Sequence, residues 1–472
     1  MKTITDPQKE IPVIYEADVV VVGGGPAGIG AALAAARNGA KTILIEKFNC
    51  LGGYQTLTFN STFSLVDPEV QNGIIQEIIA ELKKYEGAVE RDLSKDTRKR
   101  KGMGAVFFDA EYYKRLLDMM MEDAGVKVLF HAFGVGGIKE GNRIKGIFIE
   151  SIEGKRAVLG KVIIDVTGSA DISWKSGAEV FSDGFPQGPK KGRHAGYGYT
   201  FFFGNVDIPK LKQLRKEQPE EWGTLRVGMN LIQKAKAEGK LYGNRVHFLI
   251  SEVYGHNRIW ILGPQYPIPH GHHPWVLEDL SEGEKDLRKQ AWSMYDLFRE
   301  NVPGFENSYI EKTPTMLLLR DSHRIVGEYT LIEEDMRQGR IFEDSIAISN
   351  MPPDVFGPDD EHDMVNNLMP YDIPYRSLLS RDTEGLLAAG STMSVDFMVW
   401  CATRYCAPSI CTGQAAGTAA ALAVKNNVNP RNLDIQELQK TLQDQGARTS
   451  VKHMPKEVLA EYEESRQKKI KG

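Results

Sequence analysis

The chain has 472 residues, of which 42% are hydrophobic and 26% are charged. Because a single core stops growing at about 250–300 residues, this length predicts two or three lobes, and the ordinary composition excludes a disordered chain. The formal net charge of −5 gives no broad positive field, so nucleic acid is not an expected partner.

The start of the chain and its cysteines favour a soluble cytoplasmic protein. Residues 1–20 lack the basic-then-apolar order of a signal peptide. The apolar stretches 19–22 and 415–424 are much shorter than the roughly 20 residues that cross a bilayer. Four cysteines without a C-x-x-C pair fit a reducing compartment and no iron–sulfur pattern. We therefore expect no membrane span and no cluster.

The first elements predict a β-turn-α-β unit. A β-branched run from Ala17 to Val22 ends in three glycines, Ile29 to Asn38 is an alanine-rich helix, and Lys41 to Glu46 is a second strand. Such a unit builds a parallel sheet with right-handed crossovers. Further helices and strands are expected at 71–85, 110–124, 126–130, 144–150 and 161–166.

The middle of the chain differs in character from both ends. Aromatic clusters, a Pro/His loop and an amphipathic stretch from Leu280 to Asn301 indicate a separate substrate lobe. A strand at 385–389 and an alanine-rich helix at 412–426 then indicate a return to the first domain, followed by a charged helical tail. The predicted boundaries are 14–184, 185–369, 370–430 and 431–472.

The turn between the first strand and helix carries the pattern G-x-G-x-x-G at Gly23, Gly25 and Gly28. These glycines allow a tight turn, close approach to a pyrophosphate and helix packing, and the helix start attracts phosphate. Glu46 ends the next strand, where its carboxylate can accept from ribose hydroxyls. The alternative, an ordinary glycine turn, does not explain Glu46.

FAD and NAD remain to be distinguished at this point. Lys47 and the pair Gly52-Gly53 follow Glu46 and suit a second backbone approach to a longer cofactor, which favours FAD. No second strand-linked G-x-G-x-x-G is present, because the glycines at 134–137 are read as a turn between strands. The flavin is then reduced by the substrate, or by a nicotinamide that docks in the same pocket.

The sequence resembles the glutathione-reductase-like, two-dinucleotide-binding FAD superfamily, and within it the bacterial FAD-dependent oxidoreductases. The resemblance lies in the first sixty residues and in segments 162–180, 317–347 and 373–424. It implies an α/β fold in which a discontinuous Rossmann-type FAD-binding domain holds an inserted mixed α/β substrate lobe. It also implies that the residues that bind the cofactor are Gly23, Gly25, Pro26, Ala27, Gly28, Glu46, Lys47, Gly52, Gly53, Val135, Thr167, Gly168, Gly390, Thr412, Gly413 and Gln414.

Within that set the resemblance assigns particular contacts. Val135 would meet the adenine through its backbone, Thr167-Gly168 would lie near the nucleotide, and Gly390 beside the pyrophosphate. Residues 412–414 would start the helix that points at the pyrimidine edge of the flavin, where a helix start stabilises the negative charge of the reduced ring. None of the motifs supplies an attachment residue, so we expect non-covalent FAD.

The candidate catalytic residues are Arg404, His323 and Arg324. Arginine offers donors for a carboxylate or carbonyl, and histidine exchanges protons near neutral pH. The alternative for His323 is a packing residue. The loop histidines at 270, 272 and 273 suggest a metal, but adjacent side chains in a Pro/Gly loop seldom converge, so no metal is expected. The later cysteines are interpreted as packing residues.

The sequence thus predicts a cytoplasmic FAD-dependent oxidoreductase that transfers a hydride between a small-molecule substrate and flavin N5. An electron donor or acceptor is required but not identified, and an oligomer is possible. The alternatives are a flavin electron-relay subunit of a larger complex and an FAD-binding protein with a non-redox role.

Overall fold

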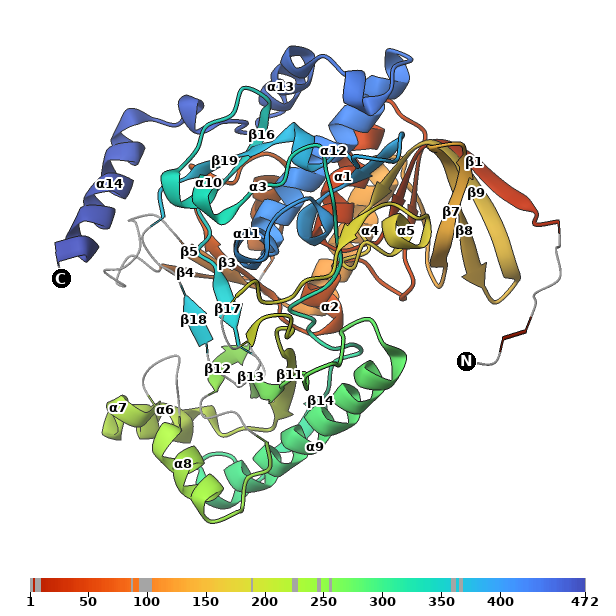
Figure 1. Ribbon diagram of the computed structural model, residues 1–472. Helices are drawn as coiled ribbons and strands as arrows, with labels where there is room; N and C mark the ends of the chain where they lie inside the picture. Colours follow the sequence, from red (N-terminus) through yellow and green to blue (C-terminus); the bar gives the residue numbers. More distant parts are fainter. Residues whose placement is uncertain are drawn as a thin grey trace.

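The computed structural model describes residues 3–4, 10–85, 88–92, 104–187, 190–222, 228–243, 248–253, 257–357, 362–364 and 368–471. In Figure 1 the sheet and helices of the first domain occupy the upper part of the molecule, and the lobe formed by the middle of the chain lies below them.

A mixed sheet forms the centre of the first domain. Its strands β1, β2, β6 and β9 are parallel, and β20 adds in parallel to β9. Strand β8 is antiparallel to β9, and β7 is antiparallel to β8 at the edge of the sheet. The order β6-β2-β1-β9-β8-β7 confirms the α/β Rossmann-type class. The bounds are β1 (Val13–Val22), β2 (Thr42–Ile45), β6 (Lys127–Leu129), β7 (Phe133–Glu140), β8 (Arg143–Ser151), β9 (Gly154–Asp165) and β20 (Leu386–Ala388).

The glycines at 134–137 lie in strand β7, so their prediction as a turn is wrong. Glycine is suited to these positions because side chains of a neighbouring helix lie close to this face of the strand and leave no room for a Cβ. A Cβ at Gly134 would stand 2.8 Å from Ile172, and one at Gly137 would stand 2.2 Å from the Ser176 hydroxyl. Both neighbours belong to the short helix α5 (Asp171–Lys175) or follow it directly, so the glycines let this helix pack on the strand.

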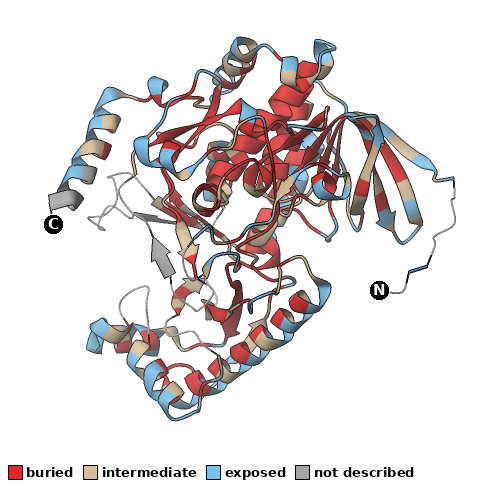
Figure 2. Cartoon of the chain, in the orientation of Figure 1, coloured by how far each residue is buried: buried red, intermediate tan, exposed pale blue. Residues whose placement is uncertain are grey.

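Helices α1 (Pro26–Arg37) and α12 (Cys406–Lys425) pack against each other beside the sheet and are buried along nearly their whole length. Figure 2 shows them as the most buried helices of the molecule. Their contact depends on glycine: a Cβ at Gly413 would lie 2.1 Å from the carbonyl oxygen of Ala27. The helix starts at Cys406, so the predicted start at Thr412 is wrong by more than one turn.

We expect Gly413→Val to lower the melting temperature. The added atoms would force α12 away from α1, and overpacking a tight core costs about 1–3 kcal/mol. Ala27, at the contact, also lines a cavity at the edge of the sheet. Thermal unfolding measures the loss. Lys440→Val, at an exposed site on helix α13 (Ile435–Asp444), controls for the effect of placing valine in a helix. Equal melting temperatures for the two variants would contradict the packing role.

The remaining elements of the first half cover the sheet and its edges. A small antiparallel sheet of β3, β5 and β4 shares its core with helices α3 and α4. The bounds are α2 (Tyr54–Leu57), β3 (Thr62–Val66), α3 (Ile74–Lys83), β4 (Val89–Asp92), β5 (Gly104–Phe107), α4 (Ala110–Asp123), α5 (Asp171–Lys175) and β10 (Val180–Phe181). The helices predicted at 71–85 and 110–124 are confirmed, with shorter ends.

The lobe is an antiparallel sheet of order β12-β13-β11-β14 with helices packed on one face. Strand β11 alternates between two faces: Tyr197, Tyr199, Phe201 and Phe203 enter the core of the lobe, and Phe202 points to the other side. The bounds are β11 (Tyr197–Gly204), α6 (Ile208–Glu217), α7 (Pro219–Trp222), α8 (Met229–Ala237), β12 (Leu249–Val253), β13 (Arg258–Tyr266), α9 (Leu277–Asn301) and β14 (Tyr309–Lys312).

After the lobe the chain returns to the first domain. Residues 331–351 already belong to the core that contains α1 and α12, whereas the core of the lobe spans 197–317. The domain boundaries stay a prediction, and we propose 197–317 as the part of 185–369 that holds the lobe together. The bounds are β15 (Arg324–Ile325), α10 (Glu333–Gln338), β16 (Ser345–Ser349), β17 (Asp354–Phe356), β18 (His362–Met364), β19 (Tyr371–Pro374), α11 (Phe397–Thr403), α13 (Ile435–Asp444) and α14 (Lys456–Lys471).

Candidate active site

A cavity of about 980 Å³ opens at the carboxyl ends of β1, β9 and β20. A smaller cavity of about 330 Å³ adjoins it towards β7 and shares Gly23, Glu46, Lys47 and Thr167 with it. Ligands of open α/β sheets bind at this edge of the sheet. Together the two cavities form a long trough, which fits an extended dinucleotide with one end at β7 and the other near the start of α12.

The glycine-rich turn forms one wall of this trough. Gly23 has a φ of +112°, a conformation that other residues rarely adopt. A Cβ at Gly28 would lie 1.8 Å from the Gly23 carbonyl oxygen, so only glycine lets α1 begin so close to the turn. Gly25, Pro26 and Ala27 line the cavity at the helix start. Backbone amides there suit a pyrophosphate.

Glu46 closes the turn from the neighbouring strand. One oxygen of its carboxylate accepts from the Gly24 amide at 2.6 Å, and the other accepts from the Phe48 amide at 2.8 Å. The residue is only 6% exposed, yet it lines both cavities. A carboxylate has about four acceptor positions, so two remain for ribose hydroxyls. Glu46 therefore both holds the turn and faces the trough.

A buried carboxylate holds the opposite wall. Asp165, at the end of β9, accepts from the Thr167 amide and hydroxyl and from the Ser173 amide and hydroxyl, at 2.7 to 3.2 Å. Burial raises the pKa of Asp165, against which these hydrogen bonds act. They fix the turn that carries Thr167 and Gly168 into the cavity.

The structure brings together ten of the residues predicted from the sequence. Those that line the cavity are Gly23, Gly25, Pro26, Ala27, Glu46, Lys47, Gly53, Thr167, Gly168 and Arg404. The others lie behind its wall or beside it, namely Gly28, Gly52, Val135, Gly390, Thr412, Gly413, Gln414, His323 and Arg324. Phe133 and Gly134, not Val135, line the end near β7.

The residues behind the wall support those in front. The Gly52 amide donates to the Gly24 carbonyl oxygen at 2.9 Å, and the Gly390 amide donates to the Thr412 hydroxyl at 3.0 Å. Gln414 accepts from the Ile74 amide at 3.0 Å and so ties α12 to α3. The residues at the start of α12 that face the cavity are Cys406 and Ser409, in place of 412–414.

Arg404 reaches the cavity from the end of α11, just before α12. Its guanidinium donates to the carbonyl oxygen and the carboxylate of Asp354 at 2.8 and 2.9 Å. Burial opposes its charge, but Asp354 raises the pKa of Arg404. Its buried Nε has no hydrogen-bond partner among the described residues. Arg404 is therefore a fixed cation with a donor left for a ligand.

His323 and Arg324 are not on the cavity wall. The His323 ring is packed between Trp174 and Trp275, with centroids 5.0 and 4.1 Å away, and burial lowers its pKa. The buried Arg324 guanidinium donates to the Val395 carbonyl oxygen at 3.0 Å and to Asp183 at 2.5 Å. The predicted position of this pair in the pocket is therefore corrected, since Asp321 and Ser322 line the cavity instead.

Asp321 leads to a chain of polar groups that sequence reasoning missed. Its carboxylate lies 2.9 Å from Nδ1 of His194, and Nε2 of His194 lies 2.9 Å from Nδ1 of His273. Asp321 and His194 are each 1% exposed, whereas His273 lies in the partly exposed Pro/His loop. Three segments far apart in the sequence thus connect the cavity to the surface.

The donor and acceptor roles in this chain depend on the tautomer of each ring. In the tautomer of His194 that carries its hydrogen on Nδ1, this nitrogen donates to the Asp321 carboxylate and Nε2 accepts from Nδ1 of His273. Burial lowers the pKa of His273, which favours its neutral ring. Among the residues that the structure describes, no group of three His, Cys, Asp or Glu side chains could hold a metal ion.

All four cysteines are free. Cys406 lines the cavity, and burial raises its pKa to about 12, so it stays a thiol at neutral pH. Burial raises the pKa of Cys401 and of Cys411 to the same value. Separately, no helix in the described part of the chain is long and apolar enough to cross a membrane.

Several solved structures are similar to this chain. One is a geranylgeranyl bacteriochlorophyll reductase-like protein from Thermoplasma acidophilum, at 15% identity over 96% of this chain and 87% of that one, with a TM-score of 0.44. Another is a flavoprotein/dehydrogenase from Cytophaga hutchinsonii, at 14% identity over 91% and 84%, with a TM-score of 0.45. A third is p-nitrophenol 4-monooxygenase from Pseudomonas putida, at 9% identity over 96% and 99%, with a TM-score of 0.45.

No curated protein matches the sequence. The model of one protein family, described as FAD dependent oxidoreductase, matches residues 18–442. That span includes the glycine turn, Glu46, the Thr167-Gly168 turn and Arg404, and the trough that these residues line fits an elongated dinucleotide. The chain therefore belongs to the FAD dependent oxidoreductase family, and its cofactor is FAD.

Proposed function

We propose that this enzyme transfers a hydride between a small-molecule substrate and N5 of FAD, within the glutathione-reductase-like superfamily. The observation that carries the proposal is that Arg404 and Asp321 line the same cavity as the glycine turn. A fixed cation and a carboxylate at the end of the trough nearest α12 suit a substrate that carries an oxygen.

FAD and the residues of the cavity would have different roles in such a reaction. FAD, when bound, supplies the two-electron chemistry. Arg404 would hold a substrate carboxylate or carbonyl oxygen through its unpaired Nε and so orient the reacting carbon. A substrate that gives up a hydride to become a carbonyl compound also gives up one proton, and the reverse reaction takes up both.

The proton that accompanies the hydride would also have a route in the protein. With His194 in the tautomer that donates to Asp321, His273 would pass a proton to Nε2 of His194 while Nδ1 of His194 passes its own to Asp321, which exchanges it with the substrate. Release of a proton from the substrate would start from the reversed tautomers. The two transfers among His273, His194 and Asp321 follow existing hydrogen bonds, and a neutral histidine both accepts and donates. The chain thereby supplies proton exchange without opening the cavity to water.

The test is anaerobic bleaching of the bound flavin by a panel of small hydroxy acids, amino acids, alcohols and nicotinamides. One compound class should reduce the flavin stoichiometrically, two electrons per FAD. If dithionite reduces the flavin but no compound of the panel does, and another protein serves as the electron donor, the chain would be an electron-relay subunit. A flavin that cycles without being reduced would point to a non-redox role.

We expect His194→Gln to slow flavin reduction by the substrate about tenfold, while FAD content and reduction by dithionite stay unchanged. Glutamine still bonds to Asp321 but cannot pass a proton, and direct acid–base groups contribute roughly a hundredfold or more. The solvent deuterium isotope effect on reduction should rise. His453→Gln, in a short helix remote from the relay, is the control. An unchanged isotope effect in His194→Gln would show that Asp321, His194 and His273 do not carry the proton.

A further inference from the structure

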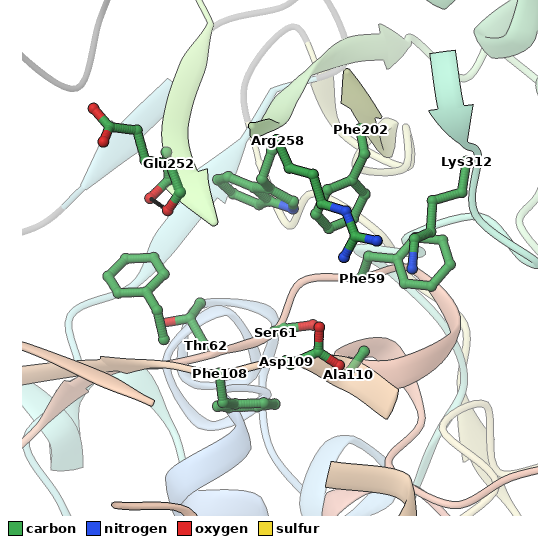
Figure 3. Close-up of a pocket in the computed structure, with 13 residues that line it drawn as sticks. Phe59, Ser61, Thr62, Phe108, Asp109, Ala110, Phe202, Glu252, Arg258 and Lys312 are labelled. Atoms are coloured by element: carbon green, nitrogen blue, oxygen red, sulfur yellow. Dashed lines mark hydrogen bonds between the residues drawn. The ribbon is translucent and has the colours of Figure 1, made fainter. Parts of the chain in front are cut away.

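A second cavity, of about 520 Å³, lies where the sheet of the lobe meets the first domain. It shares no lining residue with the FAD cavity. Figure 3 shows side chains that enter it from both sides, with Arg258, Phe202 and Lys312 on the lobe side and Ser61, Asp109 and Phe108 on the other.

The register of the lobe sheet builds one wall of this cavity. Phe202 of β11 pairs with Trp260 of β13 and with Lys312 of β14, and Trp260 pairs with Ser251 of β12. Residues paired across a sheet share a face, so these four side chains form a row across neighbouring strands. All four line the cavity. The opposite face of the same strands forms the core of the lobe.

Most of the charges around the cavity are already compensated. Arg258 pairs with Glu311 at 2.8 Å, and Glu252 pairs with Arg215 at 2.8 Å. Asp109 accepts from backbone amides at the start of α4, at 2.8 and 3.3 Å. These groups shape the cavity, but their charges do not require a ligand.

Two groups remain without a polar partner. Within the described residues, no carboxylate lies within ion-pair distance of the Lys312 ammonium, which instead stands 5.2 and 5.4 Å from the ring centroids of Phe59 and Phe202. Trp260 is 9% exposed, and its Nε1 hydrogen finds no acceptor. Buried donors normally have acceptors. The cavity thus offers a cation and an N–H donor amid aromatic rings.

The backbone at Phe59 supports a functional interpretation of this cavity. Phe59 has a φ of +57°, which is rare for a bulky residue. Two residues of the lobe hold this segment. The Thr315 amide donates to the Leu57 carbonyl oxygen at 2.8 Å, and the Thr200 hydroxyl donates to the Thr58 carbonyl oxygen. Leu57 lines the FAD cavity, so one short segment contacts both cavities.

We propose that this second cavity binds a planar aromatic carboxylate. The ring packs against Phe202 and Trp260, and the carboxylate accepts from Lys312 and from Trp260 Nε1. The aromatic walls provide the apolar contact, and the uncompensated ammonium selects for negative charge. This site is independent of the hydride transfer proposed above.

The test compares 2-naphthoate with neutral 2-naphthalenemethanol by equilibrium dialysis against the FAD-loaded protein. Naphthoate should bind more tightly and quench tryptophan fluorescence. Lys312→Gln should weaken naphthoate binding about tenfold and leave the alcohol unchanged. Trp260→Phe should remove most of the quenching. Lys440→Gln, which removes the same charge from an exposed lysine on α13 outside the cavity, should have no effect.

Three results would overturn the proposal. Equal affinity for 2-naphthoate and 2-naphthalenemethanol would show that the cavity does not select for negative charge. Equal effects of Lys312→Gln and Lys440→Gln would show that binding follows only the net charge of the protein. Loss of naphthoate binding in Arg404→Met, with none in Lys312→Gln, would place the ligand in the FAD cavity.

Discussion

Replacement of Glu46 by arginine is expected to yield a protein purified almost without FAD, with affinity lowered at least a hundredfold. The change removes the acceptor of the Gly24 and Phe48 amides and the positions left for ribose hydroxyls, and it directs a cation at these donors. One charge-assisted hydrogen bond contributes about 1.5–3 kcal/mol, which is ten- to a hundredfold in affinity. Absorbance at the flavin band gives the FAD content.

Two further variants make this result specific. Glu46→Gln keeps one acceptor oxygen and should lower the FAD affinity only about tenfold. Lys41→Gln changes an exposed residue just before the same strand that lines neither cavity, so this variant should retain FAD. FAD released into solution by denaturing the parent protein would also bear out non-covalent binding. Retention of FAD by Glu46→Arg through dialysis would rule out the ribose role.

Arg404→Met is expected to slow flavin reduction by the true substrate about a hundredfold. Methionine keeps bulk in the wall but removes the unpaired Nε donor, and misplacement of a substrate by about 1 Å costs this much in rate. FAD content and reduction by dithionite should match the parent protein, because the flavin needs no donor from this residue. Stopped-flow measurement of flavin bleaching gives the rate.

The partner of Arg404 supplies the control. Asp354→Asn weakens the same ion pair, at 2.9 Å, but leaves the guanidinium in place, so its rate should fall far less. Loss of FAD in Arg404→Met would make Arg404 a cofactor or packing residue. A rate equal to that of the parent protein would remove it from the substrate site.

The local sequence determined the half of the site that depends on near neighbours. The strand, glycine turn and helix at 13–37 follow from β-branched residues, glycines and alanines, and Glu46 follows from its place at the end of the next strand. These elements lie within one βαβ unit, whose geometry is nearly fixed by chain length and handedness. The turn and Glu46 therefore line the trough as predicted.

Only the tertiary structure decided the other half. Thr412 and Gly413 looked like a helix start, because alanines and a glycine dominate the segment, but Cys406 and Ser409 begin the helix and face the cavity, and Gly413 serves its contact with α1. Likewise His323 is an obvious acid–base candidate in sequence, yet two tryptophans from distant segments enclose it.

Asp321, His194 and His273 carry no local signal that joins them, because they come from three segments that meet only when the lobe packs on the sheet. The same is true of Phe59, Trp260 and Lys312 in the second cavity. Sequence periodicity tells which face of a strand a side chain takes, but not which other element covers that face. Local conformation was thus determined by the sequence alone, whereas the contacts across the lobe interface were decided by packing.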